Sequence, residues 1–261
     1  MRAMSDPLIF DRGAVRRHRD RAAATLEPVA TVLRDCAERL LDRLDDVKRP
    51  FAHALDIGGR GIVAPLLRAR GIEVVSMDLS ARMAALNGTP CVVGDEEWLP
   101  FAPESFDVVV ASLSLHWVND LTGALIQIRR ALRPEGLFLA SLPALGTLGE
   151  LRMALTAAEA AVSGGASPRV SPFPELRDLA GLLQRAGFSL PVTDVEEIAL
   201  RYADPMALLR DLRAAGESNA VRLRDRQTPR PAVFAHALAG LPMRDDRATA
   251  TLRLATMTGW A

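Results

Sequence analysis

The sequence has few cysteines and no long apolar run, and each absence excludes a class of protein. The two cysteines of the 261-residue chain, Cys36 and Cys91, have neither metal-ligand spacing nor the density of a disulfide framework. A reducing compartment, the cytoplasm, is therefore expected. No apolar stretch approaches the roughly 18–20 residues that cross a bilayer. We predict no integral membrane segment, and the start of the chain lacks the apolar core of a signal peptide.

An excess of either charge is also absent. The chain has 32 basic and 32 acidic residues, so no overall field favours nucleic acid or a membrane surface as a partner. The basic stretch "RRHRDR" at residues 16–21 predicts a solvated helix face, with contact to an acidic partner as the alternative. Hydrophobic residues make up 49% and charged residues 25% of the chain, which are ordinary values for a globular domain with a sizeable core. The oligomeric state is not indicated.

From residue 50 to residue 143, apolar patterns typical of strands alternate with patterns typical of helices. Strands are predicted at 54–57, 72–78, 90–95, 106–114 and 137–143, and helices at 62–70, 79–88 and 120–133, the last ended by a turn "RPEG" at 133–136. The run at 106–114 is apolar without alternation, which is typical of a parallel strand covered on both faces. Strands that alternate with helices imply right-handed crossovers and a parallel sheet.

The flanking regions follow different patterns. Residues 14–48 predict N-terminal helices, and residues 50–143 form the predicted cofactor-binding half. Residues 144–261 predict a substrate or lid half, in which helical insertions accompany strands at 193–202 and 248–260. We therefore expect a single α/β domain over the whole chain, with a Rossmann-like, seven-stranded, mostly parallel sheet and helical insertions that form a lid.

A glycine-rich loop, "GGRG" at residues 58–61, follows the first predicted strand and precedes a helix. Glycine leaves no Cβ in the way of a ligand. Taken alone, "GRGIVA" matches the dinucleotide fingerprint G-x-G-x-x-G/A, and Asp78 lies at the distance of a ribose-binding acid. A loop that merely turns the chain, with Asp78 as a helix cap, is the structural alternative.

Acidic residues at the ends of three strands favour S-adenosylmethionine (SAM) over a dinucleotide. Asp56 could hold the ammonium group of a methionine moiety, whereas it would repel a pyrophosphate. Asp95 could accept a hydrogen bond from an adenine amino group, with Trp98 or Leu99 packed on the ring. Polar and small residues also end the strand at 106–114, at the edge where open α/β sheets bind ligands. The predicted cofactor-binding residues are Asp56, Gly58, Gly59, Gly61, Asp78, Leu79, Asp95, Glu96 and Ser112.

Other polar residues are candidates for chemistry on an acceptor. His116 is the candidate general base, and Trp117 could wall the acceptor site. Glu217, Ser218 and Asn219 in "GESNA" could face a guanidinium, because carboxylates pair with arginine in bidentate fashion. The alternatives are a packed histidine and a helix cap followed by a turn. The four histidines show no ligand spacing, so no metal site is predicted.

Several stretches together resemble a known family. They are "FDR", "ALDIG", "DEEWLPF", "FDVVVASLSLHWVNDL", "SPFPELRDLAGLLQRAGF", "GESN" and the final "GW". The chain resembles the methyltransferase-fold assembly factors of respiratory complex I, in their alphaproteobacterial branch. This resemblance implies a class I methyltransferase fold, SAM under the glycine loop, and modification of an arginine in a protein substrate such as a complex I subunit, by hydroxylation in that family. A more distant likeness to the malonyl-acyl carrier protein methyltransferase of biotin synthesis implies, as an alternative, a carboxyl methyltransferase.

The glycine loop departs from the family pattern D-x-G-x-G-x-G. Aligned on Asp56, the chain lacks the residue between the first two glycines, Gly58 and Gly59. One missing residue moves later backbone amides by up to ~3.5 Å. Because those amides should lie near the methionine carboxylate, a non-catalytic assembly factor with altered SAM binding is a second alternative.

Overall fold

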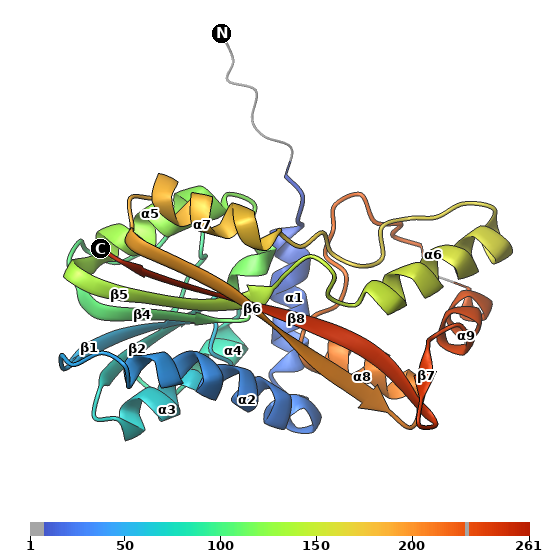
Figure 1. The fold of residues 1–261 in the computed structure, drawn as a ribbon, viewed down its shortest axis with the longest axis horizontal. Coiled ribbons are helices and arrows are strands. Elements are labelled where there is room, and N and C mark those ends of the chain that lie inside the picture. Colours follow the sequence, from blue (N-terminus) through green and yellow to red (C-terminus); the bar gives the residue numbers. More distant parts are fainter. Residues whose placement is uncertain (1–7, 228–229) are drawn as a thin grey trace, which may run out of the picture.

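The computed structural model describes residues 8–227 and 230–261, and a mixed β-sheet runs through the middle of this part (Figure 1). The strand order is β3-β2-β1-β4-β5-β8-β6, with the two-residue β7 (Met243–Arg244) paired to β8. The strands on the main path are β1 (His53–Ile57), β2 (Glu73–Asp78), β3 (Cys91–Val93), β4 (Phe106–Ser112), β5 (Leu132–Pro143), β6 (Ser189–Tyr202) and β8 (Arg247–Trp260). The pairs from β3 to β5 are parallel, and β8 is antiparallel to both of its neighbours. The α/β prediction with a mostly parallel sheet is confirmed.

Helices cover both faces of the sheet. On one face, α2 (Ala30–Leu41) and α3 (Val63–Ala69) pack leucines against the strands. On the other face, α5 (Leu121–Ala131) and α7 (Leu176–Arg185) do the same. Figure 1 shows these two helical layers above and below the strands. The buried apolar run at β4 therefore lies between two cores, as its lack of alternation predicted.

A third apolar core lies at the far end of the long β6–β8 ribbon. It joins α6 (Gly149–Ser163), α8 (Pro205–Ala214) and α9 (Pro231–Ala239) to that ribbon. Figure 1 shows these helices gathered away from β1, β2 and β3. They are the helical insertions predicted after the fifth and sixth strands, and their action as a lid stays a prediction.

One local prediction was wrong. The "RPEG" segment at 133–136 is not a turn after α5 but part of β5, where the register between β4 and β5 shifts and Glu135 has a φ of 61°. The N-terminal helices predicted over residues 14–48 are present as α1 and α2. The first, α1 (Arg12–Ala22), is capped by the side chain of Asp11, and a 3-10 turn at Glu27–Val29 separates it from α2 because Pro28 begins a new turn there.

Candidate functional site

The glycine loop makes a tight turn between β1 and α3. Gly58 and Gly61 have φ values of 69° and 75°, which glycine adopts without strain. Arg60 has a φ of 52° although it carries a side chain, so the shortened loop places a non-glycine residue in the left-handed region. The amide of Ile62 donates to the carbonyl of Gly59 over 2.8 Å, which closes the turn. Residues 58–60 are buried.

The acids at the ends of β2 and β3 are paired with arginines of α1. Asp78 is fully buried, and its Oδ2 accepts a hydrogen bond of 2.7 Å from Nη1 of Arg19. Beyond β3, Arg12 bonds Oδ1 of Asp95 over 2.6 Å and also pairs with Glu96. Arg12 and Arg19 are seven residues apart and so lie on one face of α1. The carboxylates predicted to bind adenosine are therefore already engaged within the chain.

Arg19 also fills the space directly above the glycine loop. A Cβ atom built on Gly58 would lie 2.8 Å from Nη1 of Arg19 and 2.6 Å from Cβ of Ser114. Arg19 itself is only 1% exposed. In this arrangement the residues do not fit SAM, because the face of Gly58 that a bound methionine moiety needs is occupied by the protein's own side chains.

The remaining predicted cofactor residues have mainly packing contacts. Asp56 is fully buried beneath Gly59, and burial together with the charge of Asp78 raises its pKa to about 7. Leu79 packs beside the Phe10–Trp117 pair. Ser112 places its Oγ 3.4 Å from Oγ of Ser141. Trp98, the candidate for stacking on adenine, is 79% exposed. The cofactor-binding roles of Asp56, Leu79 and Ser112 stay predictions.

Glu217 brings the predicted acceptor residues together. The loop after α8 places its Oε2 2.8 Å from Nε2 of His116 and 2.8 Å from Nε1 of Trp117. Its Oε1 accepts from Nη2 of Arg60 over 2.5 Å. Burial works against the charge of Glu217, but His116 and then Arg60 outweigh it and lower the pKa to about 2. Glu217 is thus an ionised carboxylate that ties the glycine loop to the end of β4.

Of the other predicted residues in "GESN", Asn219 is hydrogen-bonded to nearby backbone groups. Nδ2 of Asn219 donates to the carbonyl of Pro168 over 2.8 Å, and its Oδ1 accepts from the amide of Val221. Asn219 also lines the cavity beside Glu217. The substrate-binding roles of Ser218 and Asn219 stay predictions.

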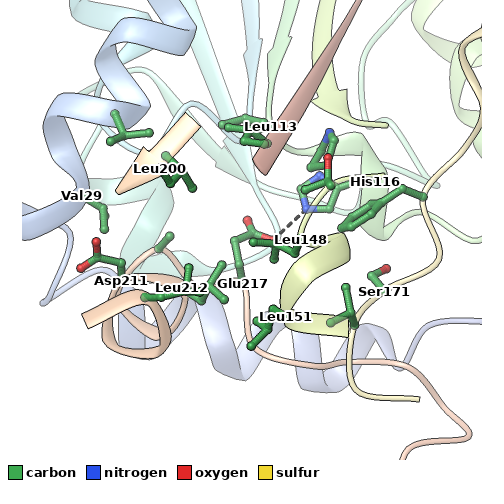
Figure 2. A pocket seen from close by; sticks show the side chains of 18 of the residues that line it. Val29, Leu113, His116, Leu148, Leu151, Ser171, Leu200, Asp211, Leu212 and Glu217 are labelled. Atoms are coloured by element: carbon green, nitrogen blue, oxygen red, sulfur yellow. Dashed lines mark hydrogen bonds and ion pairs between the residues drawn. The ribbon is translucent and has the colours of Figure 1, made fainter. Parts of the chain in front are cut away.

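An apolar cavity of about 160 Å³ lies beside Glu217. Figure 2 shows Glu217 and its hydrogen bond to His116 among the lining side chains. The ring of Phe173 is 6.3 Å from that of His116. A cavity of this size and polarity suits a compact apolar group with a polar end toward the carboxylate. The leucines that line it come from α2, the end of β4, α6, β6, α8 and β8, and they are Leu33, Leu113, Leu148, Leu151, Leu200, Leu208, Leu212 and Leu252.

Three arginines of the site, Arg12, Arg19 and Arg60, were missed from the sequence. Arginine side chains are usually exposed, and the solvated helix face predicted for "RRHRDR" is wrong for Arg19, which is buried. The seven-residue spacing of Arg12 and Arg19 was the available signal. Within residues 8–227 and 230–261, no cluster of three His, Cys, Asp or Glu residues could ligate a metal ion, and no helix is both long and apolar enough for a bilayer.

Comparisons with known proteins agree with this architecture. A family model described as "Methyltransferase domain" matches residues 55–140. Among solved structures, the YcgJ protein from Bacillus superposes with a TM-score of 0.58 at 14% identity, covering 85% of this chain and 97% of that one. A putative methyltransferase from Bacillus halodurans C-125 superposes with a TM-score of 0.55 at 18% identity, covering 84% of this chain and 96% of that one. The fold is therefore that of the class I methyltransferases.

Two groups of relatives share most of the chain. "Arginine-hydroxylase NDUFAF5, mitochondrial" of Homo sapiens is 39% identical over 264 residues, covering 97% of this chain and 76% of that protein. The Danio rerio protein of the same name is 36% identical, covering 97% of this chain and 82% of that protein. "Malonyl-[acyl-carrier protein] O-methyltransferase" of Methylovorus sp. is 36% identical over 239 residues, covering 85% and 79%. The chain belongs to the NDUFAF5 arginine-hydroxylase family of methyltransferase-fold proteins.

Proposed function

We propose that this protein is a SAM-dependent enzyme of the cytoplasm that modifies an arginine side chain of a protein substrate during assembly of respiratory complex I. The name of its relatives in the NDUFAF5 family supports arginine as the target. The matched methyltransferase domain supports SAM as the ligand of the glycine loop, once the loop is accessible.

Glu217 carries the proposal for the substrate. It is ionised, it lines the apolar cavity, and its neighbours His116 and Trp117 hold it in place. An arginine side chain has an apolar stem and a cationic, planar head. The stem matches the leucine walls, and the head matches a fixed carboxylate at the end of the cavity. Glu217 would orient the guanidinium, and His116 would hold that carboxylate in place, while its role as a general base stays a prediction.

The test of this function is the product. A recombinant complex I subunit is incubated with the protein and SAM, and its arginines are examined by mass spectrometry for the added mass of a methyl group or of one oxygen atom. Glu217→Gln should raise KM for the subunit more than it lowers kcat, whereas Glu73→Gln, an exposed carboxylate at the start of β2, should change neither. Modification of malonyl-acyl carrier protein in place of an arginine would contradict the proposal.

A non-catalytic assembly factor is the second candidate, and the arginine above Gly58 is the observation that favours it. A protein of this kind would keep the fold and the substrate-binding cavity but lose the cofactor. Calorimetry separates the two candidates. Retained binding of the complex I subunit, with no heat of SAM binding even at millimolar SAM, supports the assembly factor.

A further inference from the structure

We propose that Arg19 is a displaceable internal occupant of the cofactor crevice, so that binding of SAM and docking of the α1 arginines exclude each other. This inference rests on the proposed function in one respect, that SAM is the ligand of the glycine loop. The side chains of α1 would then be the reason why the crevice, as observed, does not fit the cofactor.

The guanidinium of Arg19 occupies the volume in which SAM would bind. It lies between the carboxylate of Asp78 and the face of Gly58 that has no Cβ atom. A ligand that contacts both groups must occupy the same volume. Glu96 is a second carboxylate near Arg19, at 3.7 Å from Nη1. Burial disfavours the charge of Arg19, but Asp78 and Glu96 more than offset this effect and raise its pKa above that of ordinary arginine. Arg19 is therefore a cation held in an acidic pocket.

The guanidinium is incompletely satisfied in that position. Its Nε and Nη2 atoms are buried and have no hydrogen-bond partner among the described residues. Ser114, which touches the same face of Gly58, has an unpartnered Oγ as well. Buried donors without acceptors destabilise the state that contains them. The ion pair with Asp78 therefore holds Arg19 in the crevice, while its unpartnered donors weaken this state. A ligand that pairs with Asp78 without leaving buried donors unpaired can replace it.

The second arginine of α1 closes the adjacent part of the crevice. Arg12 bonds Asp95 and Glu96, and its Nη1 donates to the carbonyl of Trp117 over 3.1 Å. Both arginines belong to one helix of 11 residues, so a movement that withdraws Arg19 also strains the contacts of Arg12. Release of α1 is therefore expected to free the acids at the ends of both β2 and β3.

The exchange would replace one set of positive groups with another. The crevice and Glu217 together gather four carboxylates, those of Asp78, Asp95, Glu96 and Glu217, against the guanidiniums of Arg12, Arg19 and Arg60. Withdrawal of the α1 arginines leaves a strongly negative pocket. SAM carries a sulfonium cation, an ammonium group and a carboxylate, so that one net positive charge remains, and its ribose hydroxyls are donors for a carboxylate. A cationic nucleoside is thus the class of ligand that can replace two arginines here.

Calorimetry with SAM on the full chain tests the inference. The apparent affinity of a ligand is reduced by the fraction of molecules in which its site is open, so removal of the occupant should tighten binding. Arg19→Gln is expected to bind SAM on the order of tenfold more tightly than the wild type. Arg16→Gln removes the same charge from an exposed position of the same helix and should leave the affinity unchanged.

The outcomes separate the inference from the function on which it rests. Equal or weaker binding by Arg19→Gln would overturn the inference while leaving SAM as the ligand. Absence of binding by both proteins would overturn it together with the proposed cofactor. Because Arg19→Gln leaves Asp78 without its partner and could impair folding, a second measurement uses the wild type alone. Addition of SAM should speed amide hydrogen exchange in α1 and not in α9, and slower exchange in α1 would contradict the inference.

Discussion

The two sides of Glu217 are built in opposite ways. On the side of the glycine loop, charged side chains fill a buried crevice, in which Asp78, Asp95 and Glu217 are each paired with an arginine. On the other side, leucines line a cavity that is left hollow. Opening the crevice means separating ion pairs in a medium of low dielectric constant, whereas the cavity needs no rearrangement to accept an apolar group. If the proposed function holds, the substrate side is preformed and the cofactor side has to be opened.

The largest expected effect comes from removing the most buried ion pair of the crevice, between Arg19 and Asp78. Asp78→Asn removes the carboxylate from Arg19, and both side chains are almost completely inaccessible to water. An uncompensated charge remains, so we expect a loss of about 3–5 kcal/mol in the free energy of unfolding. Urea denaturation measures it. The control is Asp35→Asn, in a surface pair with Arg39, which should cost no more than about 1 kcal/mol. A similar loss in both variants would remove the distinction between crevice and surface.

Asp56, beneath the glycine loop, adds a pH dependence of its own. Its pKa is raised to about 7, so between the unfolded value of 3.8 and pH 7 the folded protein binds the extra proton. Its contribution to stability is complete below the unfolded pKa and is lost as the pH rises toward 7. Asp56→Asn stays neutral, so its stability relative to wild type should increase by up to about 1.4 kcal/mol per pH unit in this window. Urea denaturation at several pH values measures this, and parallel pH profiles would contradict it.

Glu217, at the border of the two regions, should show the opposite dependence. Its pKa is lowered to about 2, so its contribution is complete above the unfolded value of 4.5 and is lost as the pH falls toward 2. Since the side chain is 21% exposed, we expect Glu217→Gln to cost about 2 kcal/mol at neutral pH and progressively less in acid. The difference in urea midpoint between variant and wild type should therefore shrink on acidification. A constant difference would mean that Glu217 acts through packing alone.

The comparison also explains what could be predicted from the sequence. Apolar runs predicted β2 and β4 because a strand buried on both faces needs nothing else. Asp78 could be located because it ends such a strand, and Glu217 because it stands in "GESN" after a predicted helix. Their partners could not be found in the same way. Arg19 meets Asp78 across 59 positions of the sequence, and a buried ion pair leaves no local periodicity. The cavity was missed for the same reason, since its leucines come from separate elements that look like ordinary core.

The smallest effect is expected from filling the cavity. Leu151 is 3% exposed and lines the hollow, so the larger ring of Leu151→Phe can occupy empty space rather than displace neighbours. We expect the free energy of unfolding to change by less than about 1 kcal/mol, because overpacking is costly only where the core is already full. The same change should weaken binding of the protein substrate, because the space for an arginine stem is reduced. Leu183→Phe, in the full core under α7, is the control and should destabilise by about 1–3 kcal/mol. Equal losses in the two variants would show that the wall beside Glu217 is as tightly packed as the core, and that the substrate side also has to open.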